Sequence, residues 1–260
     1  MEQVKISIIT ITYNSERTVE ETLKSVISQA YPNLEYIIVD GASKDRTLDV
    51  VTKYKDSIAR IISEPDKGIA DAFNKGIRMA TGDLIGIINS DDLLLPGALR
   101  KMAESYDGET DVYRGNTVIS NMVSQFRCRE IPSMKFPTVP YTIHMAHPST
   151  FVSRKAYQKY GAFDLDFRYI MDLELLCRFY RLGATFKYVD ADIAEFRIGG
   201  ATSDSIARKK KDLFLLIRKN GGTTLQAWSY YAFLQLFDCG KRVLNFLFGE
   251  DFKRKLRYRK

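Results

Sequence analysis

Cysteine and histidine are scarce in this chain of 260 residues. The three cysteines, Cys128, Cys177 and Cys239, are widely spaced and odd in number, which indicates neither a disulfide framework nor a cysteine-based zinc site. The two histidines, His144 and His147, have the spacing His-x-x-His with no cysteine nearby, which does not favour zinc either. This usage predicts a reducing compartment.

Long apolar runs are absent as well. No stretch reaches the ~18–20 apolar residues that a membrane-spanning helix needs. The first residues, MEQVKISIITITYN, lack the basic region and apolar core of a signal peptide, and they read as a buried strand. This strand is followed by Thr12-Tyr13-Asn14-Ser15 where a dinucleotide-dependent oxidoreductase would have G-x-G-x-x-G, so that class is excluded.

Positive charge is confined to the end of the chain. The net charge is +7, yet residues 206–260 hold 14 Lys and Arg against 4 Asp and Glu, whereas the remainder holds 25 against 28. The same segment is rich in aromatic residues and ends in KRKLRYRK. This composition predicts helices that lie in the headgroup layer of an anionic membrane. The alternative is a helical pair that packs on the body of the protein with its charges in solvent.

Short β-rich runs alternate with helical patterns over the first 105 residues. Strands are predicted at 5–12, 35–40, 58–63 and 83–89, and helices from residue 19 and at 45–54, 68–80 and 96–105. This alternation indicates an α/β fold with a mostly parallel sheet and right-handed crossovers. Farther along, strands are predicted at 111–120 and 185–189 and helices at 153–160, 172–182 and from 206, with 121–150 mostly loop.

Polar residues gather where the predicted strands end. Thr12-Tyr13-Asn14 follows the first strand, Asp40 ends the second, Asp66-Lys67-Gly68 follows the third, and Asn89-Ser90-Asp91-Asp92 follows the fourth. A single Asp at a strand end reads as a turn or a helix cap. Ligands of open parallel sheets, however, bind outside the carboxyl ends of the strands, so four polar ends together indicate a binding site.

An apolar run, Leu84–Ile88, ends in Asn89-Ser90 and the adjacent carboxylates Asp91 and Asp92. Two neighbouring carboxylates repel each other and are costly to desolvate unless a positive charge lies between them. Mg²⁺ and Mn²⁺ prefer oxygen ligands and share their shell with phosphate oxygens. The pair therefore predicts a divalent metal that carries a diphosphate, on which it acts as a Lewis acid. A carboxylate such as Asp40 suits acceptance of a ring N–H of a nucleobase.

Four segments, "SIITITYN", "YIIVDGASKDRT", "SEPDKGIADAFNKGI" and "ATGDLIGIINSDD", resemble the family-2 glycosyltransferases of the GT-A fold in order and spacing. The resemblance covers roughly residues 4–200 and extends to "HPSTF", "YGAFD" and "MDLELLCR". It implies a Rossmann-like catalytic domain at 1–205, divided into a nucleotide-sugar half at 1–110 and an acceptor half at 111–205, before the basic helical segment at 206–260. It also implies an inverting, metal-dependent transferase.

The resemblance assigns donor contacts to the polar strand ends. Thr10, Tyr13 and Asp40 would contact the nucleobase and ribose, and Asp91 and Asp92 the diphosphate and its Mg²⁺ or Mn²⁺. The family often has Asp where this chain has Asn89, and many relatives carry Arg where it has Phe73, so Lys67 or Lys75 would supply charge near the phosphates. The full donor set implied is Thr10, Thr12, Tyr13, Asn14, Asp40, Asp66, Lys67, Gly68, Asn74, Lys75, Asn89, Ser90 and Asp91.

On the acceptor side, Asp172 matches the catalytic base of the family, with Met171 in place of the first residue of an acidic pair. Inversion requires a base opposite the leaving group, within reach of the acceptor hydroxyl. Asp172 also opens a predicted helix, so it could act as a cap. His147 matches a segment that lines the acceptor, and Arg197 begins Arg197-Ile198-Gly199-Gly200, which resembles a segment that closes over the donor and equally suits a turn.

We thus expect a glycosyltransferase of surface polysaccharide or lipid-linked glycan synthesis, with a UDP-sugar as the favoured donor. It would lie on the cytoplasmic face of the membrane, held by residues 206–260, with no nucleic acid as partner. Other classes fit less well. A haloacid dehalogenase phosphatase needs a second Asp where Ala42 stands, and a sugar nucleotidylyltransferase needs an early Gly-rich, Arg-containing loop. A non-enzymatic module that binds anionic surfaces leaves the acidic strand ends unexplained.

Overall fold

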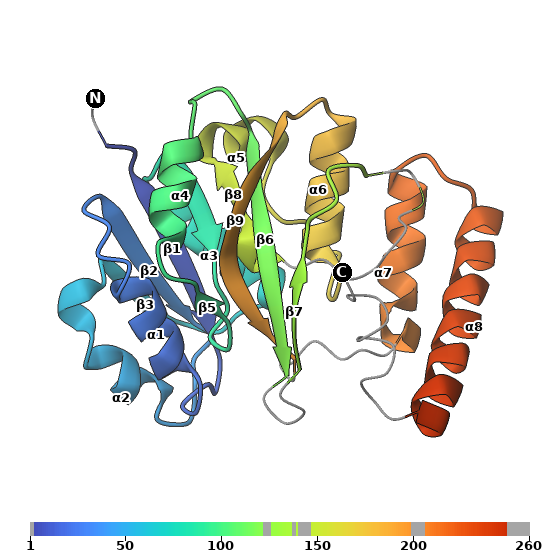
Figure 1. The fold of residues 1–260 in the computed structure, drawn as a ribbon, viewed down its shortest axis with the longest axis horizontal. Coiled ribbons are helices and arrows are strands. Elements are labelled where there is room, and N and C mark those ends of the chain that lie inside the picture. The colour runs from blue at the N-terminus through green and yellow to red at the C-terminus, as the bar shows by residue number, and fades with distance from the viewer. Residues whose placement is uncertain (1–2, 122–125, 137–138, 140–146, 199–205, 249–260) are drawn as a thin grey trace.

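The computed structural model describes residues 3–121, 126–136, 139, 147–198 and 206–248, except the side chains of 241–248. Its centre is one nine-stranded sheet in the order β3-β2-β1-β4-β8-β6-β9-β5, with β7 paired to β6 (Figure 1). The strands are β1 (Ile6–Thr12), β2 (Leu34–Asp40), β3 (Arg60–Ser63), β4 (Leu84–Ile87), β5 (Leu93–Leu94), β6 (Val112–Asn121), β7 (Phe126–Glu130), β8 (Thr150–Ser153) and β9 (Phe186–Arg197).

The predicted alternation of strands and helices is confirmed for the first 105 residues. β1 pairs in parallel with β2 and β4, and β2 with β3, so the carboxyl ends of four strands meet at one edge. Between them lie α1 (Val19–Ile27), α2 (Thr47–Thr52), the 3₁₀ turn η1 (Lys55–Ser57), α3 (Ile69–Met79) and, after β5, α4 (Ala98–Ser105). The helix predicted at 45–54 is shorter than expected: Asp45 lies in a turn before it and accepts hydrogen bonds from the amide and hydroxyl of Thr47, the first helical residue.

The second half is more strand-rich than the sequence predicts. The segment 121–150 is not mostly loop in its described part, since β7 occupies 126–130, and β8 precedes the helix expected at 153. β9 has 12 residues where five were expected. Pairing is antiparallel for β4–β8, β6–β8, β6–β7 and β5–β9, so the sheet is mixed beyond the parallel run β3-β2-β1-β4.

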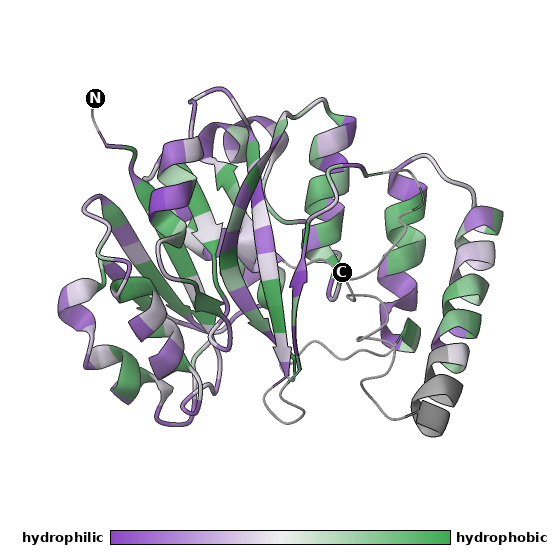
Figure 2. Cartoon of the chain, in the orientation of Figure 1, coloured by the Kyte–Doolittle hydropathy of each residue, from purple (hydrophilic) through white to green (hydrophobic). Residues whose placement is uncertain are grey.

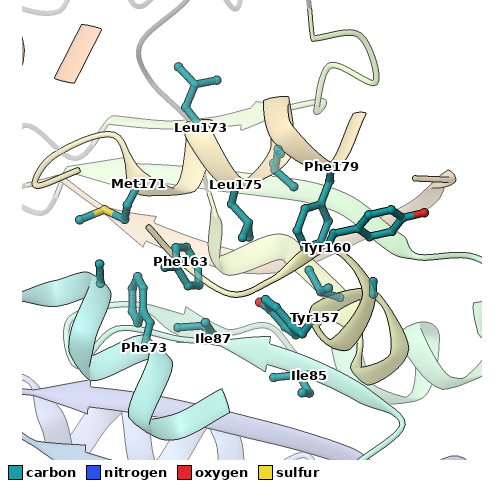
Figure 3. Close-up of a cluster of buried hydrophobic side chains, with 14 of the residues drawn as sticks. Phe73, Ile85, Ile87, Tyr157, Tyr160, Phe163, Met171, Leu173, Leu175 and Phe179 are labelled. Carbon is teal, nitrogen blue, oxygen red and sulfur yellow. The ribbon is translucent and has the colours of Figure 1, made fainter. Parts of the chain in front are cut away.

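Helices cover both faces of the sheet. Odd-numbered positions of β1 and β2, such as Ile9 and Val39, pack against α3, α5 (Arg154–Tyr160) and α6 (Met171–Arg181), and Figure 3 shows part of this cluster. Even-numbered positions, such as Ile8 and Ile38, pack against α1, α2 and α4. Burial on both faces explains the continuous apolar runs of these strands, which period-two alternation would not produce.

The last two helices form a pair at one end of the molecule, α7 (Ile206–Lys219) beside α6 and α8 (Thr224–Phe248) outermost (Figure 1). Leu216 of α7 belongs to the main core cluster, and Leu213, Ile217, Ala227 and Leu234 pack between the two helices. Figure 2 shows that apolar residues continue along α8. Among the described residues, no helix is long and apolar enough to span a membrane.

Candidate active site

The loops after β1, β2 and β3 lie side by side at the carboxyl edge of the sheet. Tyr13 is 62% exposed at the end of β1. A Cβ atom on Gly41 would lie 2.7 Å from Oδ2 of Asp66 and 3.3 Å from Cδ2 of Tyr13, so only glycine leaves this gap open. An exposed aromatic ring and a carboxylate on either side of bare backbone suit a planar ring with N–H donors. Tyr13, predicted to contact the nucleobase, and Asp66, predicted as part of the donor set, thus lie on either side of Gly41.

The carboxylate of Asp40 joins these loops by accepting hydrogen bonds from them. Its side chain is fully buried, and Oδ1 accepts hydrogen bonds from Oγ1 of Thr12 at 3.2 Å and from Oγ of Ser43 at 2.5 Å. Oδ2 accepts from the amide of Ser43 at 3.0 Å and from Oγ of Ser63 at 2.7 Å. These four donors fix three loops to one carboxylate. A direct contact of Asp40 with a base stays a prediction.

The remaining residues after β1 are also engaged with neighbouring loops. Thr10 is fully buried, and its hydroxyl lies 3.0 Å from that of Tyr36, so it packs in the core behind the edge. Asn14 has a φ of 50°, and its Oδ1 accepts a hydrogen bond of 2.8 Å from the amide of Lys44. Asparagine tolerates this left-handed conformation better than most residues do. Asn14 therefore shapes the pocket rim through its backbone.

The two candidate phosphate cations, Lys67 and Lys75, differ in their surroundings. Nζ of Lys75 donates to Asp66 at 2.6 Å and to the carbonyl of Pro65 at 2.8 Å, and it lies 3.0 Å from Glu64. Lys75 thus braces the loop after β3. Lys67 is exposed, and no ion pair of its ammonium is found within the described residues. Gly68 between them has a φ of 125° at the start of α3, a conformation that favours glycine.

Asn74 and Phe73 turn toward the acceptor half instead of the donor. Asn74 exchanges two hydrogen bonds with the backbone of Phe163, at 2.8 and 2.9 Å. The ring of Phe73 lies 4.9 Å from that of Phe163 and 5.6 Å from that of His147, between centroids (Figure 3). Phe73 thus packs the loop before α6 against α3.

The acidic pair after β4 occupies two different environments. Asp92 is fully buried; its Oδ1 accepts a hydrogen bond of 3.1 Å from the amide of Arg197, and within the described residues its Oδ2 has no hydrogen-bond partner. Asp91 is partly exposed. Oδ1 of Asn89 is also buried without a partner in that part of the chain, and Ser90 is tied to Ser15 through hydroxyls 2.8 Å apart.

Burial disfavours the charge of both carboxylates. It raises the pKa of Asp91, which the Arg197 charge partly opposes, and it raises the pKa of Asp92 well above its usual range, with a further contribution from the charge of Asp91. A cation at this position would relieve both the burial cost and the repulsion. The described residues contain no cluster of three or more His, Cys, Asp or Glu that could hold a metal. The residues therefore fit a cation that completes its shell with substrate phosphate oxygens.

Arg197 was expected on the acceptor side, but it lies beside the acidic pair. Its guanidinium forms an ion pair with Glu21, its side chain is 18% exposed, and its Nε is buried without a hydrogen-bond partner among the described residues. The Nε–H group of Arg197 could therefore donate to an anionic ligand, provided that a cation lies between this ligand and the two carboxylates. Gly199 and Gly200, which follow it, lie outside the described residues.

Asp172 stands in the first turn of α6, next to His147 of the 3₁₀ turn η2 (His147–Ser149). Nδ1 of His147 lies 3.8 Å from Oδ2 of Asp172, and the Asp172 side chain is 17% exposed. Burial raises its pKa to about 6, although the amide of Leu173 and the charges of Lys209 and Arg114 oppose this. His144, the other half of the histidine pair, lies outside the described residues.

Three residues near Asp172 were missed by sequence reasoning. Arg114 is 3% exposed on β6, and burial lowers its pKa to about 10. Lys209 and Asp212 of α7 are 8% and 2% exposed. The sequence gives no local signal that Lys209 is buried. It stands in the run Arg208-Lys209-Lys210-Lys211, which is typical of a solvent-exposed helix face.

Comparisons with known proteins agree with this geometry. The family model for glycosyl transferase family 2 matches residues 7–161. A curated relative of Escherichia coli, UDP-Glc:alpha-D-GlcNAc-diphosphoundecaprenol beta-1,3-glucosyltransferase WfaP, is 42% identical over 88 residues, which cover 34% of this chain and 35% of the relative. The chain spans between 33% and 68% of the length of eight such relatives.

Two solved structures show the same fold. Staphylococcus aureus TarS 1–349 in complex with UDP-GlcNAc has a TM-score of 0.66 and 20% identity, over 82% of this chain and 65% of that chain. The mannosyltransferase PcManGT of Pyrobaculum calidifontis, in complex with GDP-Man and Mn²⁺, has a TM-score of 0.64 and 17% identity, over 89% and 70%. The expected GT-A fold is thus confirmed, and the chain belongs to glycosyl transferase family 2.

Proposed function

We propose that this protein transfers a sugar from a nucleoside-diphosphate donor to a hydroxyl group of a glycan or lipid-linked acceptor, with inversion at the anomeric carbon. The observation that carries the proposal is the combination of two features: the adjacent carboxylates of Asp91 and the buried Asp92, whose charge a cation would stabilise, and the partly exposed carboxylate of Asp172 with its raised pKa. η2 packs against β4 and carries His147 next to Asp172, so both features lie around one edge of the sheet.

Different residues contact the base and the diphosphate of the donor. Tyr13 and Asp66 receive the base, while Asp91, Asp92 and Arg197 surround the diphosphate. When a divalent metal is bound by Asp91 and Asp92, it stabilises the charge of the leaving diphosphate. Asp91 is the more accessible of the two, because Oδ1 of Asp92 is already bound to the Arg197 amide.

Asp172 takes the proton of the acceptor hydroxyl while the bond from that oxygen to the anomeric carbon forms and the bond to the diphosphate oxygen breaks. A pKa of about 6 suits this role, since the carboxylate is mostly ionised at neutral pH and still more basic than an ordinary Asp. Replacement by Asn keeps the shape and removes the base. We expect Asp172→Asn to lower turnover by about 10²–10⁴-fold while nucleoside-diphosphate binding persists. Equal turnover of the variant and the wild type would show that Asp172 is not the base.

The names of similar proteins supply the candidate substrates. UDP-linked sugars occur in two of them and a diphosphoundecaprenol-linked acceptor in one. For this chain we therefore propose a UDP-sugar donor and an acceptor that resides in a membrane. Nucleotide preference is tested by screening release of UDP, GDP, CDP and dTDP from their sugars.

The outer face of α8 supports a location on an anionic membrane. Ala227 and Leu234 are buried against α7, whereas Leu225 and Leu236 on the opposite face are 76% and 74% exposed. Trp228, Phe233 and Phe237 lie to either side and are 49–57% exposed, and the ring of Trp228 also contacts Phe214 of α7. One apolar face of α8 contacts α7, so the other apolar face requires a second apolar environment, such as the interior of a lipid bilayer. The excess of basic residues in the same segment of the sequence, including KRKLRYRK at its end, favours anionic lipid headgroups over another protein.

Flotation with vesicles tests this location. The protein is expected to float with vesicles that contain phosphatidylglycerol and to bind less to phosphatidylcholine alone. The double variant Leu236→Ser/Phe237→Ser should lose flotation, whereas Leu182→Ser, an exposed apolar residue after α6, should not. Failure of the wild type to float would exclude the membrane, and a concentration-dependent dimer in its place would identify a second copy as the partner of α8.

A further inference from the structure

The start of the helix that carries Asp172 is only partly capped by its own side chains, since Asp172 accepts a hydrogen bond from the amide of Leu173 alone. Ile170 is the N-cap residue of α6 and provides no side-chain hydrogen bond, so the amide groups before the helix need an acceptor from elsewhere. Asp212 of α7 provides it. Its Oδ2 accepts hydrogen bonds from the amides of Arg168 at 2.8 Å, Tyr169 at 2.7 Å and Ile170 at 3.4 Å.

This contact is buried and spans the sequence. Asp212 is 2% exposed and lies 42 to 44 residues after the amides that it binds. Buried charge-assisted hydrogen bonds of this kind are stronger than neutral ones, and removal of the acceptor leaves three amides without a partner. The end of the loop that leads into Asp172 is thus fixed by α7.

The other end of the same loop is held by different residues. Asn74 binds the backbone of Phe163, and Arg178 donates to the carbonyl of Ala162 at 2.6 Å. Lys219, at the far end of α7, forms an ion pair with Asp164 and lies 3.5 Å from Asp166. Asp212 is therefore the α7 contact adjacent to Asp172, and Lys219 offers a control on the same helix.

Lys209 lies one turn before Asp212 and is 8% exposed. Its charge lowers the pKa of Asp172, as does that of Arg114 on β6. His147 of η2 faces the same carboxylate at 3.8 Å, and Glu174 and Cys177 are the titratable neighbours on α6 itself. α7 thus provides both the acceptor that fixes the start of α6 and one of the charges around the base.

We propose that Asp212 is a positioning residue for Asp172, and that α7 is a part of the catalytic apparatus in addition to being the connection to α8. The proposal rests on the role of Asp172 proposed above. It means that the basic segment cannot be removed as a separable membrane anchor, since its first helix sets the place of the base (Figure 1).

The test measures the titration of the Asp172 carboxyl group by carbon NMR on protein with labelled aspartate, with the signal assigned by its loss in Asp172→Asn. The wild-type group is expected to titrate near its pKa of about 6. In Asp212→Ala, release of residues 168–170 exposes the start of α6, so the pKa should fall toward the ordinary value. Asp212→Asn, which keeps an acceptor oxygen, should largely restore it. Lys209→Met should move the pKa upward.

Lys219→Met is the matched control and should leave the titration unchanged, although it removes an ion pair of the same loop. Thermal unfolding of each variant shows that it is folded. An unaltered Asp172 titration in a folded Asp212→Ala protein would overturn the proposal, as would an equal change in Lys219→Met. If Asp172→Asn turned over donor like the wild type, the proposed function would fail, while the titration would still report whether Asp212 positions the carboxyl group.

Discussion

Replacement of Asp172 by Asn should stabilise the protein at neutral pH while it lowers turnover. The folded-state pKa of about 6 lies above the ordinary 3.8. Between these values the folded protein binds more protons than the unfolded chain, so the free energy of unfolding falls as pH rises from about 4 to 6. Because Asn does not ionise, the free energy of unfolding of the variant does not fall over this pH range.

The size of the gain follows from the shift. The distance from 3.8 to about 6 corresponds to an upper limit of about 3 kcal/mol. The side chain keeps 17% of its surface in water, which screens part of the burial cost. We therefore expect the variant to be more stable by about 1–2 kcal/mol at pH 7.5.

Urea denaturation followed by circular dichroism measures this difference at a series of pH values. The gain should shrink as pH is lowered from 7.5 and vanish near pH 4. Asp166→Asn, in a side chain that is 72% exposed, is the control and should stay within about 0.5 kcal/mol of the wild type. A variant that is no more stable than the wild type at pH 7.5, or a gain that does not depend on pH, would refute the assignment of a raised pKa to Asp172.

Three further changes have clear expectations. In Gly86→Ala the new Cβ atom would lie 2.6 Å from Cε1 of the buried Phe151, so urea denaturation should show a loss of about 1–3 kcal/mol, and unchanged stability would mean that β4 and β8 pack less closely. Glu35 is 6% exposed and accepts three hydrogen bonds at the amino edge of the sheet; Glu35→Ala should cost about 1–3 kcal/mol at neutral pH, against little change for Glu109→Ala in an exposed loop. Tyr13→Ala should weaken nucleoside-diphosphate binding by about 3–10-fold in calorimetry and leave the unfolding temperature unchanged, since the ring is exposed; equal affinity would remove Tyr13 from the base pocket.

β1, β2 and β4 could be predicted because they are buried on both faces. Residues such as those of β1 and β2 give continuous β-branched runs, and their polar ends stand out against them. β9 could not be predicted in full, since FKYVDADIAEFR mixes charges with apolar residues. The charges are compensated across the sheet, where Arg127 and Arg129 of β7 pair with Glu195 and Asp192. Such compensation depends on strands that are distant in sequence.

In the candidate site, too, the features that depend on local sequence could be predicted, whereas contacts between distant segments could not. The sequence indicated Tyr13, Asp66, the acidic pair and Asp172, because each stands at the end of a strand or the start of a helix. It did not indicate that Lys75 is held by three oxygens near it, or that Arg197 lies against Asp92 across 105 residues. Asp212 was missed for the same reason, since only the docking of α7 brings its carboxylate to the start of α6.

The central claim is that the acidic pair after β4 holds a divalent cation together with a nucleoside diphosphate. Calorimetric titration of UDP, GDP, CDP and dTDP, each with and without Mn²⁺, tests it most directly on the wild type and on Asp91→Ala and Asp92→Ala. Asp56→Ala serves as the control, because η1 lies at the opposite edge of the sheet. The account predicts that one nucleotide binds the wild type and Asp56→Ala only with the metal, and that binding is lost in Asp91→Ala and Asp92→Ala. Binding that is equal with and without Mn²⁺, or that persists in both site variants, would contradict it.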